Sequence, residues 1–402
     1  MTTIIKHAAL FDGVKEELQK DSWLSFDEQT EKIVQIGTGE PDQPEAEKVI
    51  DAHGKYLLPG LINAHTHIMM NPIHNKLDHL SETECTVNGI NNLKQLLNAG
   101  VTYIRDCGCA FDTDIKLSRL MAEGKVSGPQ IVPSGRPMSM TGGHGDFVEG
   151  IDGDTVWGHL TDSVDEMRHA VRIQFKHGAK NIKVMATGGV MSATDEIDDI
   201  ELSGPELAVA VQEAHSKHMT VASHAQGNLG IQLSLEAGVD SIEHGIYVDE
   251  DQAEFMKENN IFLVPTLNAS QCISDEGKGI LPDYMMRKND NVKRDFFKNI
   301  AMALKKGVKV AVGTDAGTPF NRFDIGTARE IELLVSIGAT NAQALFGATR
   351  YAAELLRIDA NYGTLEEGKF ADMLLLDKNP LYDITAIRTS HKEIFQKGKK
   401  VK

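Results

Sequence analysis

The chain has 402 residues, of which 41% are hydrophobic and 25% are charged, ordinary proportions for a soluble globular protein. Its formal net charge of -17 argues against a nucleic-acid-binding groove, which would need clustered lysine and arginine. No apolar run approaches the roughly 20 residues that a membrane-spanning helix needs. We therefore expect neither a nucleic acid nor a membrane as a partner. The length suits two or three domains, or one barrel with additions.

The four cysteines, Cys85, Cys107, Cys109 and Cys272, are too few and too scattered for a disulfide framework. The pair Cys107 and Cys109 is a weak signal for metal or redox chemistry, and buried structural thiols are the simpler interpretation. The first residues also lack an apolar stretch long enough for a signal peptide. These features predict a cytoplasmic protein.

Both ends of the chain contain short apolar runs separated by turns, which is typical of β-structure. The expected strands at the two ends are Ile33–Gly37, Val49–Asp51, Tyr56–Leu58, Ala371–Leu376 and Glu393–Gln396. We predict that residues 1–58 and 363–402 together form one small composite β-sandwich domain.

Between these ends, short apolar runs alternate with segments of helical periodicity, the pattern of repeated βα units. The expected strands are Leu61–His67, Val101–Asp106, Gln130–Ser134, Ile182–Ala186, Thr220–His224, Ser241–His244, Ile261–Thr266 and Val308–Thr314. The expected helices include Gly89–Ala99, Val164–His177, Pro205–His218 and Asn291–Lys306. Glycines stand where helices should end, at Gly100, Gly178, Gly238 and Gly307. This α/β pattern favours a closed (β/α)8 TIM barrel over an open sheet, with the barrel predicted to span residues 59–362.

His65 and His67 stand two residues apart at the end of the first expected barrel strand. Residues with this spacing in a strand point to the same side. Two imidazoles on one side form half of a site for a borderline-soft cation such as Zn²⁺. The pair is a weak motif by itself, but its position strengthens it, because barrel active sites collect at the carboxyl ends of the strands.

Four further polar residues occupy comparable places: Lys183 within an apolar run, and His224, His244 and Asp315 at the ends of theirs. Each has a structural explanation by itself, as a satisfied core histidine, a buried salt bridge or, for Asp315, a helix N-cap. A lysine inside an apolar strand must lose its charge, find a partner or extend to solvent. Coincidence explains poorly why all of them fall at matching strands, so we interpret them as one site with the first histidine pair.

The motifs in and around this site are Leu58–His67, Lys183, His224, His244, Gly313–Gly317 and Gly363–Asp372. Together they resemble the amidohydrolase superfamily, over nearly the whole chain. The resemblance implies a hydrolase with two divalent metal ions, expected to be Zn²⁺, bridged by Lys183 after its carboxylation by CO2. The other implied ligands are His65, His67 and Asp315 for the first metal, and His224 and His244 for the second.

The implied centre is chemically coherent. A buried neutral lysine amine can react with CO2, which turns a costly cation into an anionic oxygen ligand. A water between the two metals would lose its proton near neutral pH and attack the scissile carbonyl. Asp315 could both bind a metal and pass that proton to the leaving amine, which makes it the predicted catalytic residue.

Two glycine-containing segments narrow the resemblance: Ser139–Asp146 after the third expected strand and Ala186–Ser192 after the fourth. Both resemble the prolidase-like group of Xaa-Pro and Xaa-Arg dipeptidases, which also includes imidazolonepropionase-like proteins. In that group the histidine matching His144 is associated with the C-terminal carboxylate of the substrate. The alternative for His144 is a loop histidine that bonds to backbone.

Gln226 departs from this group, because the dipeptidases have a tyrosine after the histidine of the fifth strand. Gln226 could bind substrate by donating an amide N–H in the tyrosine's place, with a different reach and acidity. The segment Asn268–Lys288 contains Gly277 and Gly279 and is expected to be a lid that shapes the side-chain pocket.

The predicted function is hydrolysis of an amide C–N bond in a small molecule, either a dipeptide or an N-acyl amino acid. Cyclic-amide hydrolysis, as in hydantoinase or imidazolonepropionase relatives, would use the same metal centre and stays open as the alternative. Deaminases of the superfamily use one metal and a glutamate soon after the fifth-strand histidine, where this chain has Gln226. A non-catalytic scaffold is disfavoured because every ligand position is filled. The oligomeric state stays open, and a homo-oligomer is compatible with the sequence.

Overall fold

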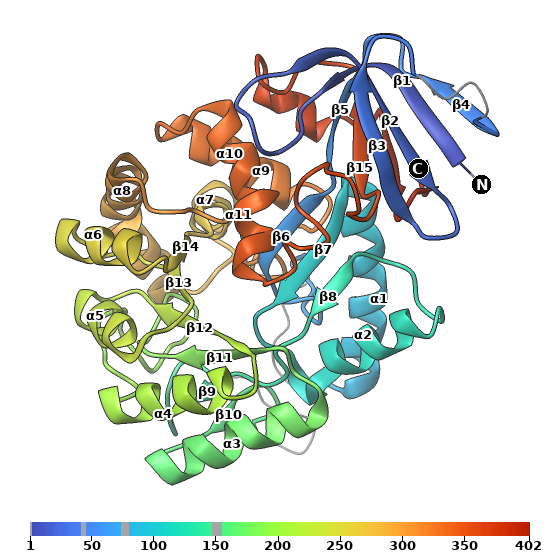
Figure 1. The fold of residues 1–402 in the computed structure, drawn as a ribbon. Coiled ribbons are helices and arrows are strands. Elements are labelled where there is room, and N and C mark those ends of the chain that lie inside the picture. Colours follow the sequence, from blue (N-terminus) through green and yellow to red (C-terminus); the bar gives the residue numbers. More distant parts are fainter. Residues whose placement is uncertain (1, 42–45, 74–79, 147–154) are drawn as a thin grey trace.

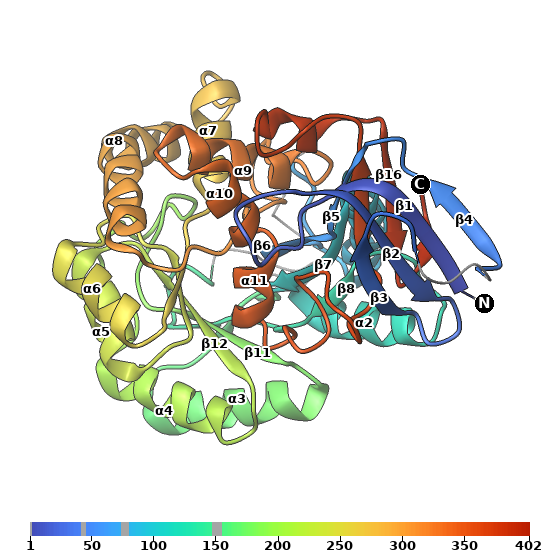
Figure 2. The same cartoon turned by 45° about the horizontal axis from the view of Figure 1, so that its top comes forward.

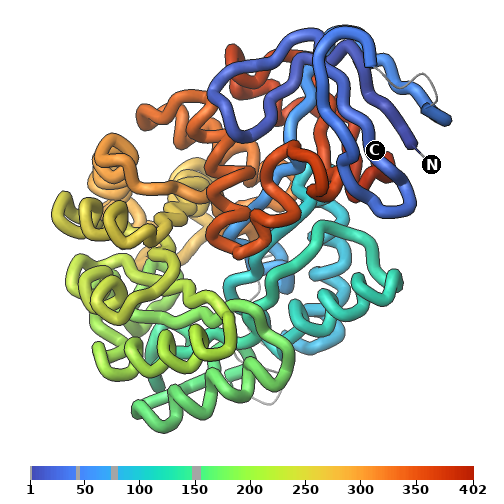
Figure 3. Tube along the Cα trace, viewed as in Figure 1, coloured from blue at the N-terminus to red at the C-terminus, as the bar shows by residue number. Residues whose placement is uncertain are grey.

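The computed structural model describes residues 2–41, 46–73, 80–146 and 155–402. Two regions stand out in Figure 1: a β-sheet that contains both ends of the chain, and a larger region of parallel strands surrounded by helices. In Figure 3 the blue N-terminal and red C-terminal parts of the tube run side by side in the sheet region.

The sheet region contains strands from both ends, in the order β17-β16-β15-β5-β1-β2-β3, with β4 paired to β1. The two chain ends meet where β5 pairs antiparallel with β15, for example at Leu58 and Leu374. Its strands are β1 (Thr2–Leu10), β2 (Gln19–Asp27), β3 (Lys32–Thr38), β4 (Lys48–Asp51), β5 (Tyr56–Pro59), β15 (Met373–Leu376), β16 (Lys392–Gln396) and β17 (Lys399–Lys400).

The strand pairing gives one continuous sheet, whereas the sequence predicted a β-sandwich, which has two packed sheets. Strand β1 explains the difference, because one edge pairs with β2 while the other pairs first with β4 and then with β5. The sheet has its own hydrophobic core, in which Leu24, Phe26, Leu375 and Phe395 are fully buried or nearly so.

The parallel strands of the second region form two sheets, β6-β7-β8 and β10-β9-β11-β12-β13-β14. These strands are buried along most of their length, as expected for parallel strands covered by helices on the outside. They are β6 (Leu61–Thr66), β7 (Val101–Asp106), β8 (Gln130–Val132), β9 (Met138–Ser139), β10 (His159–Leu160), β11 (Asn181–Met185), β12 (Thr220–Ala225), β13 (Ser241–His244) and β14 (Phe262–Val264). The predicted α/β class is confirmed.

The last predicted strand, Val308–Thr314, is wrong as a regular strand, because it forms only an isolated bridge at Val310. The N–H of Val312 donates to the carbonyl of Gly347 at 2.8 Å instead of extending a ladder. The run nevertheless lies between β14 and β6: Ala311 donates to Leu263 at 2.9 Å, and Ala64 donates to Val312 at 2.8 Å. Within the described residues the strand pairings thus leave two parallel sheets and not one closed ring.

The helices lie on the outside of these strands, as the rotated view in Figure 2 shows. Each of the four predicted terminal glycines caps its helix in the left-handed region, with φ between 83° and 112°. The helices are α1 (Glu82–Ala99), α2 (Thr113–Ala122), α3 (Val164–His177), α4 (Gly204–His215), α5 (Asn228–Ala237), α6 (Glu250–Glu258), α7 (Leu267–Glu276), α8 (Asp283–Lys306), α9 (Gly326–Ser336), α10 (Asn341–Gly347) and α11 (Arg350–Leu355). Short 3₁₀ turns cover Ala110–Asp112 and Ile384–Arg388.

The predicted lid segment Asn268–Lys288 is helical for most of its length, since it contains α7 and the start of α8. Its inner face is buried, so the segment is a packed helical hairpin. None of the helices within the described residues combines the length and the apolar character needed to cross a membrane. The four cysteines are free and buried, as predicted.

Candidate active site

A cavity opens at the carboxyl ends of the parallel strands, with about 730 Å³ of empty space when the part open to solvent is counted. Strand ends of a parallel sheet share one edge, which explains how residues far apart in sequence meet there. The structure places every predicted site residue in the lining of this cavity. They are His65, His67, His144, Lys183, His224, Gln226, His244 and Asp315.

The first group in the cavity consists of His65, His67 and Asp315, with one ligand atom from each lying within 4.8 Å of the others. The Oδ1 atom of Asp315 is 3.4 Å from Nε2 of His65 and 3.1 Å from Nε2 of His67. Asp315 has a left-handed backbone conformation, with φ of 59°, directly after the run that hydrogen-bonds to β6. Two imidazoles and one carboxylate therefore converge on one point.

The second group consists of Lys183, His224 and His244, from the neighbouring strands β11, β12 and β13. The rings of His224 and His244 have their centroids 4.6 Å apart, and the ring of His244 lies 5.2 Å from that of His65. Lys183 is 1% exposed, and among the described residues its ammonium has no hydrogen-bond partner. The buried side chain of Lys183 therefore lies in the same cavity as the two histidines.

Histidines of both groups use one ring nitrogen for a hydrogen bond to a neighbouring backbone or side-chain oxygen. His67 Nδ1 donates to the carbonyl of Gly108 at 2.9 Å, and His224 Nε2 donates to the carbonyl of Gly188 at 3.1 Å. A carbonyl can only accept, so the opposite nitrogen of each ring keeps a lone pair when the ring is neutral. His244 Nδ1 lies 2.7 Å from the hydroxyl of Thr266. Such outward hydrogen bonds are typical of metal-binding histidines.

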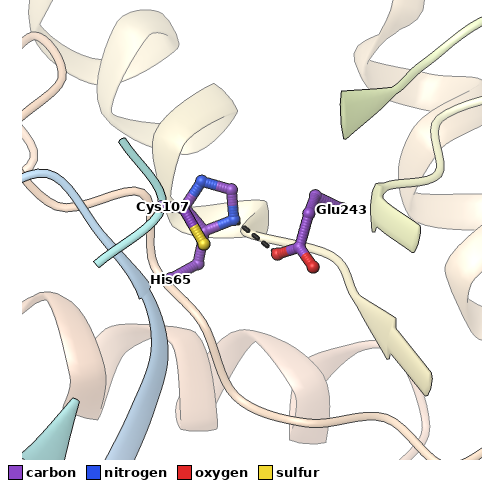
Figure 4. Close-up of side chains that lie close together, drawn as sticks. All are labelled: His65, Cys107 and Glu243. Atoms are coloured by element: carbon purple, nitrogen blue, oxygen red, sulfur yellow. Dashed lines mark hydrogen bonds and ion pairs between the residues drawn. The ribbon is translucent and has the colours of Figure 1, made fainter. Parts of the chain in front are cut away.

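His65 is held by a buried chain of charges that the sequence did not reveal. Its Nδ1 atom lies 2.6 Å from a carboxylate oxygen of Glu243 (Figure 4). The other oxygen of Glu243 accepts from Arg105 at 2.6 Å. Burial alone would raise the pKa of Glu243, but Arg105 and His65 lower it below its usual range. An ionised Glu243 therefore fixes the ring so that Nε2 faces Asp315.

The protonation states of Asp315, His224 and His244 suit a metal. Burial raises the pKa of Asp315, but the adjacent His65 and His67 outweigh it and hold that pKa well below the usual value. Burial lowers the pKa of His224 and that of His244 well below the usual value. A carboxylate and neutral imidazoles are the forms that bind divalent metals.

His65 gives the most direct test of whether a metal fits. Its Nε2 atom is buried and has no hydrogen-bond partner among the described residues. Burial lowers the pKa of His65, yet the neighbouring Cys107 and Asp315 raise it well above its usual value. This position therefore favours a positive charge, and nitrogen and carboxylate donors suit Zn²⁺. The residues present fit a divalent cation.

His144 is held by side chains as well as backbone. Its ring stacks on that of His224 with centroids 4.5 Å apart, and Nδ1 lies 3.0 Å from Asp195. Asp195 also pairs with the buried Lys288 at 3.0 Å. Burial raises the pKa of Asp195, but His144 and Lys288 lower it to about 2. A Cβ atom on Gly189 would lie 2.4 Å from the ring of His144, so only glycine permits this approach.

Lys288 connects helix α8 to the loop that follows β11. Its ammonium donates to the carbonyls of Gly189 and Ser192 at 3.0 and 2.9 Å, and to both the backbone and the side chain of Asp195. The loop beside His144 is therefore fixed to a helix that also lines the cavity.

Gln226 follows β12 and is 6% exposed at the cavity wall. Its backbone N–H donates to the hydroxyl of Thr187 at 3.0 Å, which fixes the position of the residue. Its side-chain oxygen is buried with no hydrogen-bond partner among the described residues. The amide is therefore available to a polar group of a substrate.

Sequence reasoning missed the supporting residues Arg105, Glu243, Asp195 and Lys288. Two of them could have been found by the rule that identified Lys183, a charged residue inside an apolar strand. Arg105 is such a residue in one strand, and Glu243 directly precedes His244 in another. Asp195 and Lys288 lie in polar stretches of ordinary composition, and nothing local distinguishes them.

The chain belongs to the amidohydrolase family, whose model matches residues 56–401. Ochratoxinase from Aspergillus niger is 34% identical over 331 residues, which cover 76% of this chain and 64% of the ochratoxinase. A solved Xaa-Pro dipeptidase with methionine bound in its active site has a TM-score of 0.91 and 28% identity, and the match covers all of both chains. A prolidase complexed with N-methylphosphonate-L-proline has a TM-score of 0.90 and 29% identity, again over both full chains. The chain is thus similar to hydrolases of the expected prolidase-like group.

Proposed function

We propose that this protein is a metal-dependent amidohydrolase that cleaves an amide C–N bond in a dipeptide or an N-acyl amino acid. The observation that carries the proposal is the convergence of His65, His67 and Asp315, in which the buried Nε2 atom of His65 has no hydrogen-bond partner among the described residues. The similar dipeptidase, prolidase and ochratoxinase support amide hydrolysis. We also propose that residues 59–362 form a closed (β/α)8 barrel, and that 1–58 and 363–402 form the β domain.

We propose two divalent metal ions, most simply Zn²⁺, in this cavity. His65, His67 and Asp315 would hold one, His224 and His244 the other, and carboxylated Lys183 would supply an oxygen to each. When bound, such ions lower the pKa of a coordinated water and polarise a carbonyl. Lys183 fits this role because its amine lies buried beside the histidines with no described hydrogen-bond partner.

The chain's own residues supply the proton transfer and the positioning. The Oδ1 atom of Asp315 faces both histidines, which leaves Oδ2 to accept a proton and deliver it to the leaving nitrogen. His144, fixed by Asp195, would bind the C-terminal carboxylate of the substrate. Gln226 would bind the polar atoms of the scissile amide through its unmatched side-chain amide.

Metal analysis and a substrate panel test the proposal together. We expect about two equivalents of zinc per chain and hydrolysis of dipeptides or N-acyl amino acids by the zinc-loaded protein. Activity that persists in protein shown to be free of metal would overturn the metal-dependent mechanism. Cleavage of cyclic amides alone would replace the proposed substrate class by the hydantoinase-like alternative.

A further inference from the structure

The cavity has two chemically different walls. The strand ends and the loops after them contribute the histidines, Lys183 and Asp315, whereas another part of the lining comes from helices α7 and α8. On α8 the lining positions are three, four or seven residues apart, and on α7 Ile273 is three and four residues from the other two, so the lining residues of each helix share one face. The residues that these two helices contribute are Ala269, Ser270, Ile273, Asn289, Val292 and Phe296.

This helical wall carries no charged side chain among the residues described as lining the cavity. Lys288 is on α8, but its ammonium is bound by the carbonyls of the loop after β11 and by Asp195. Asp275 on α7 pairs with Arg329 at 2.8 Å and is partly exposed. No carboxylate of the wall is therefore placed to bind a cationic substrate side chain.

The apolar wall continues to the position of His144. Val190 and Met191 directly follow Gly189, the residue packed against the His144 ring, and both line the cavity. They also pack with Ile273 of α7 in one hydrophobic cluster. A substrate residue whose carboxylate lies at His144 would therefore place its side chain against this apolar surface.

We infer that the substrate's carboxyl-terminal residue, the one released as the free amine, has a large apolar or aromatic side chain that packs on α7 and α8. The inference rests on the proposed function and names its substrate class. Charged side chains would lose their hydration there without gaining a partner.

A series of N-acetyl amino acids and Gly-Xaa dipeptides tests the inference with zinc-loaded protein. We expect kcat/KM for phenylalanine, leucine and methionine to exceed that for alanine by about 10- to 100-fold, since burial of one such side chain is worth about that factor. Arginine and glutamate should fall below alanine. Equal or higher kcat/KM for either charged residue would overturn the inference.

Two substitutions locate the effect on the wall. Ile273→Ala should lower kcat/KM for phenylalanine about 10-fold while leaving alanine nearly unchanged. Val292→Asp should shift the preference toward arginine. Ile280→Ala is the matched control, because Ile280 lies between the same two helices but is 70% exposed and does not line the cavity. If Ile280→Ala lowered kcat/KM for phenylalanine as much as Ile273→Ala does, Ile273 could not be assigned to the surface that binds the substrate side chain.

Binding distinguishes this inference from the proposed function. Calorimetric titration of zinc-loaded protein with the free amino acids phenylalanine and arginine, which have no amide bond to cleave, reports the preference without turnover. Tighter binding of the phenylalanine compound with no cleavage of any panel member would keep the apolar site and reject the proposed hydrolysis. Cleavage with equal binding of the two compounds would keep the hydrolysis and reject the apolar site.

Discussion

The two halves of the candidate metal centre differ in how completely the folded chain assembles them. In the first half, His65, His67 and Asp315 place ligand atoms within 4.8 Å of one another. In the second half, the rings of His224 and His244 lie 4.6 Å apart, but among the described residues no carboxylate or thiol joins them in a similarly close trio.

The difference is one of charge. The first half has its own anion in Asp315, and Glu243 with Arg105 fixes His65 from behind. The second half has two neutral imidazoles and a buried amine, and it gains an anion only if Lys183 is carboxylated. We therefore expect the first half to bind a metal ion more tightly, and the second to depend on CO2.

Asp315→Asn removes the anion of the first half and should have the largest effect. We expect kcat/KM to fall by at least about 10³-fold, because the side chain would act in both ligation and proton transfer. Zinc content measured by mass spectrometry should fall by about one equivalent or more. Wild-type zinc content together with wild-type activity would remove Asp315 from the centre.

Lys183→Ala should separate the two halves. We expect about one zinc equivalent to remain in the first half while the second is lost, with kcat/KM reduced by about 10²- to 10³-fold. Added acetate or propionate should restore part of both by supplying the missing carboxylate. The matched control is Lys180→Ala, an exposed lysine just before the same strand. Two tightly bound zinc ions in Lys183→Ala would show that the lysine is no ligand.

Glu243→Gln weakens the support of the first half without touching its ligands. The amide keeps an acceptor for Arg105 but no longer favours donation from Nδ1 of His65, so zinc affinity should fall about 10- to 100-fold at one site. Competition with a chelator measures the affinity, and a melting curve separates it from loss of folding. The exposed Glu236→Gln is the control. An unchanged zinc Kd would reduce Glu243 to a structural partner of Arg105.

Much of this centre could be predicted because its ligands follow a local rule. A polar residue at the end of an apolar strand is visible in a few neighbouring residues, and parallel strands bring those ends together. The supporting pairs follow no such rule: His65 and Glu243 are 178 positions apart, and Asp195 and Lys288 are 93 apart. Only the folded chain brings them into contact.

The fold shows the same limit. Apolar runs located the parallel strands, but composition could not show that the N–H of Val312 bonds to Gly347 and interrupts a strand. The glycines in Asn268–Lys288 favoured a lid that shapes the side-chain pocket. The segment does line the cavity, but its apolar face, formed by Ile273 and its neighbours, packs it as helices that the glycines did not indicate. Tertiary packing outweighed local flexibility there.

His144→Asn tests the loop that lies beside the second half. The ring stacks on His224, so both zinc content and activity should be followed. We expect kcat/KM to fall about 10-fold for dipeptides and little for their C-terminally amidated analogues, because only the former have the carboxylate. Equal losses for both substrates would exclude a carboxylate-binding role. A lost zinc ion would instead assign the ring to support of His224.

Glu201→Gln should have the smallest effect, and it contrasts the carboxylates behind the two halves. Glu243 is held ionised by Arg105, whereas burial raises the pKa of Glu201 from 4.5 to about 8, against a lowering hydrogen bond from the N–H of His144. Between pH 4.5 and pH 8 the carboxyl group of Glu201 keeps its proton in the folded state but has lost it in the unfolded state. Stability from this group therefore falls as pH rises from 4.5 through 8.

Glutamine cannot ionise, so the Tm advantage of the variant over wild type should grow by a few degrees between pH 5 and pH 9. The exposed Glu258→Gln should show no such trend, and a pH-independent difference for Glu201→Gln would mean that Glu201 is ionised throughout.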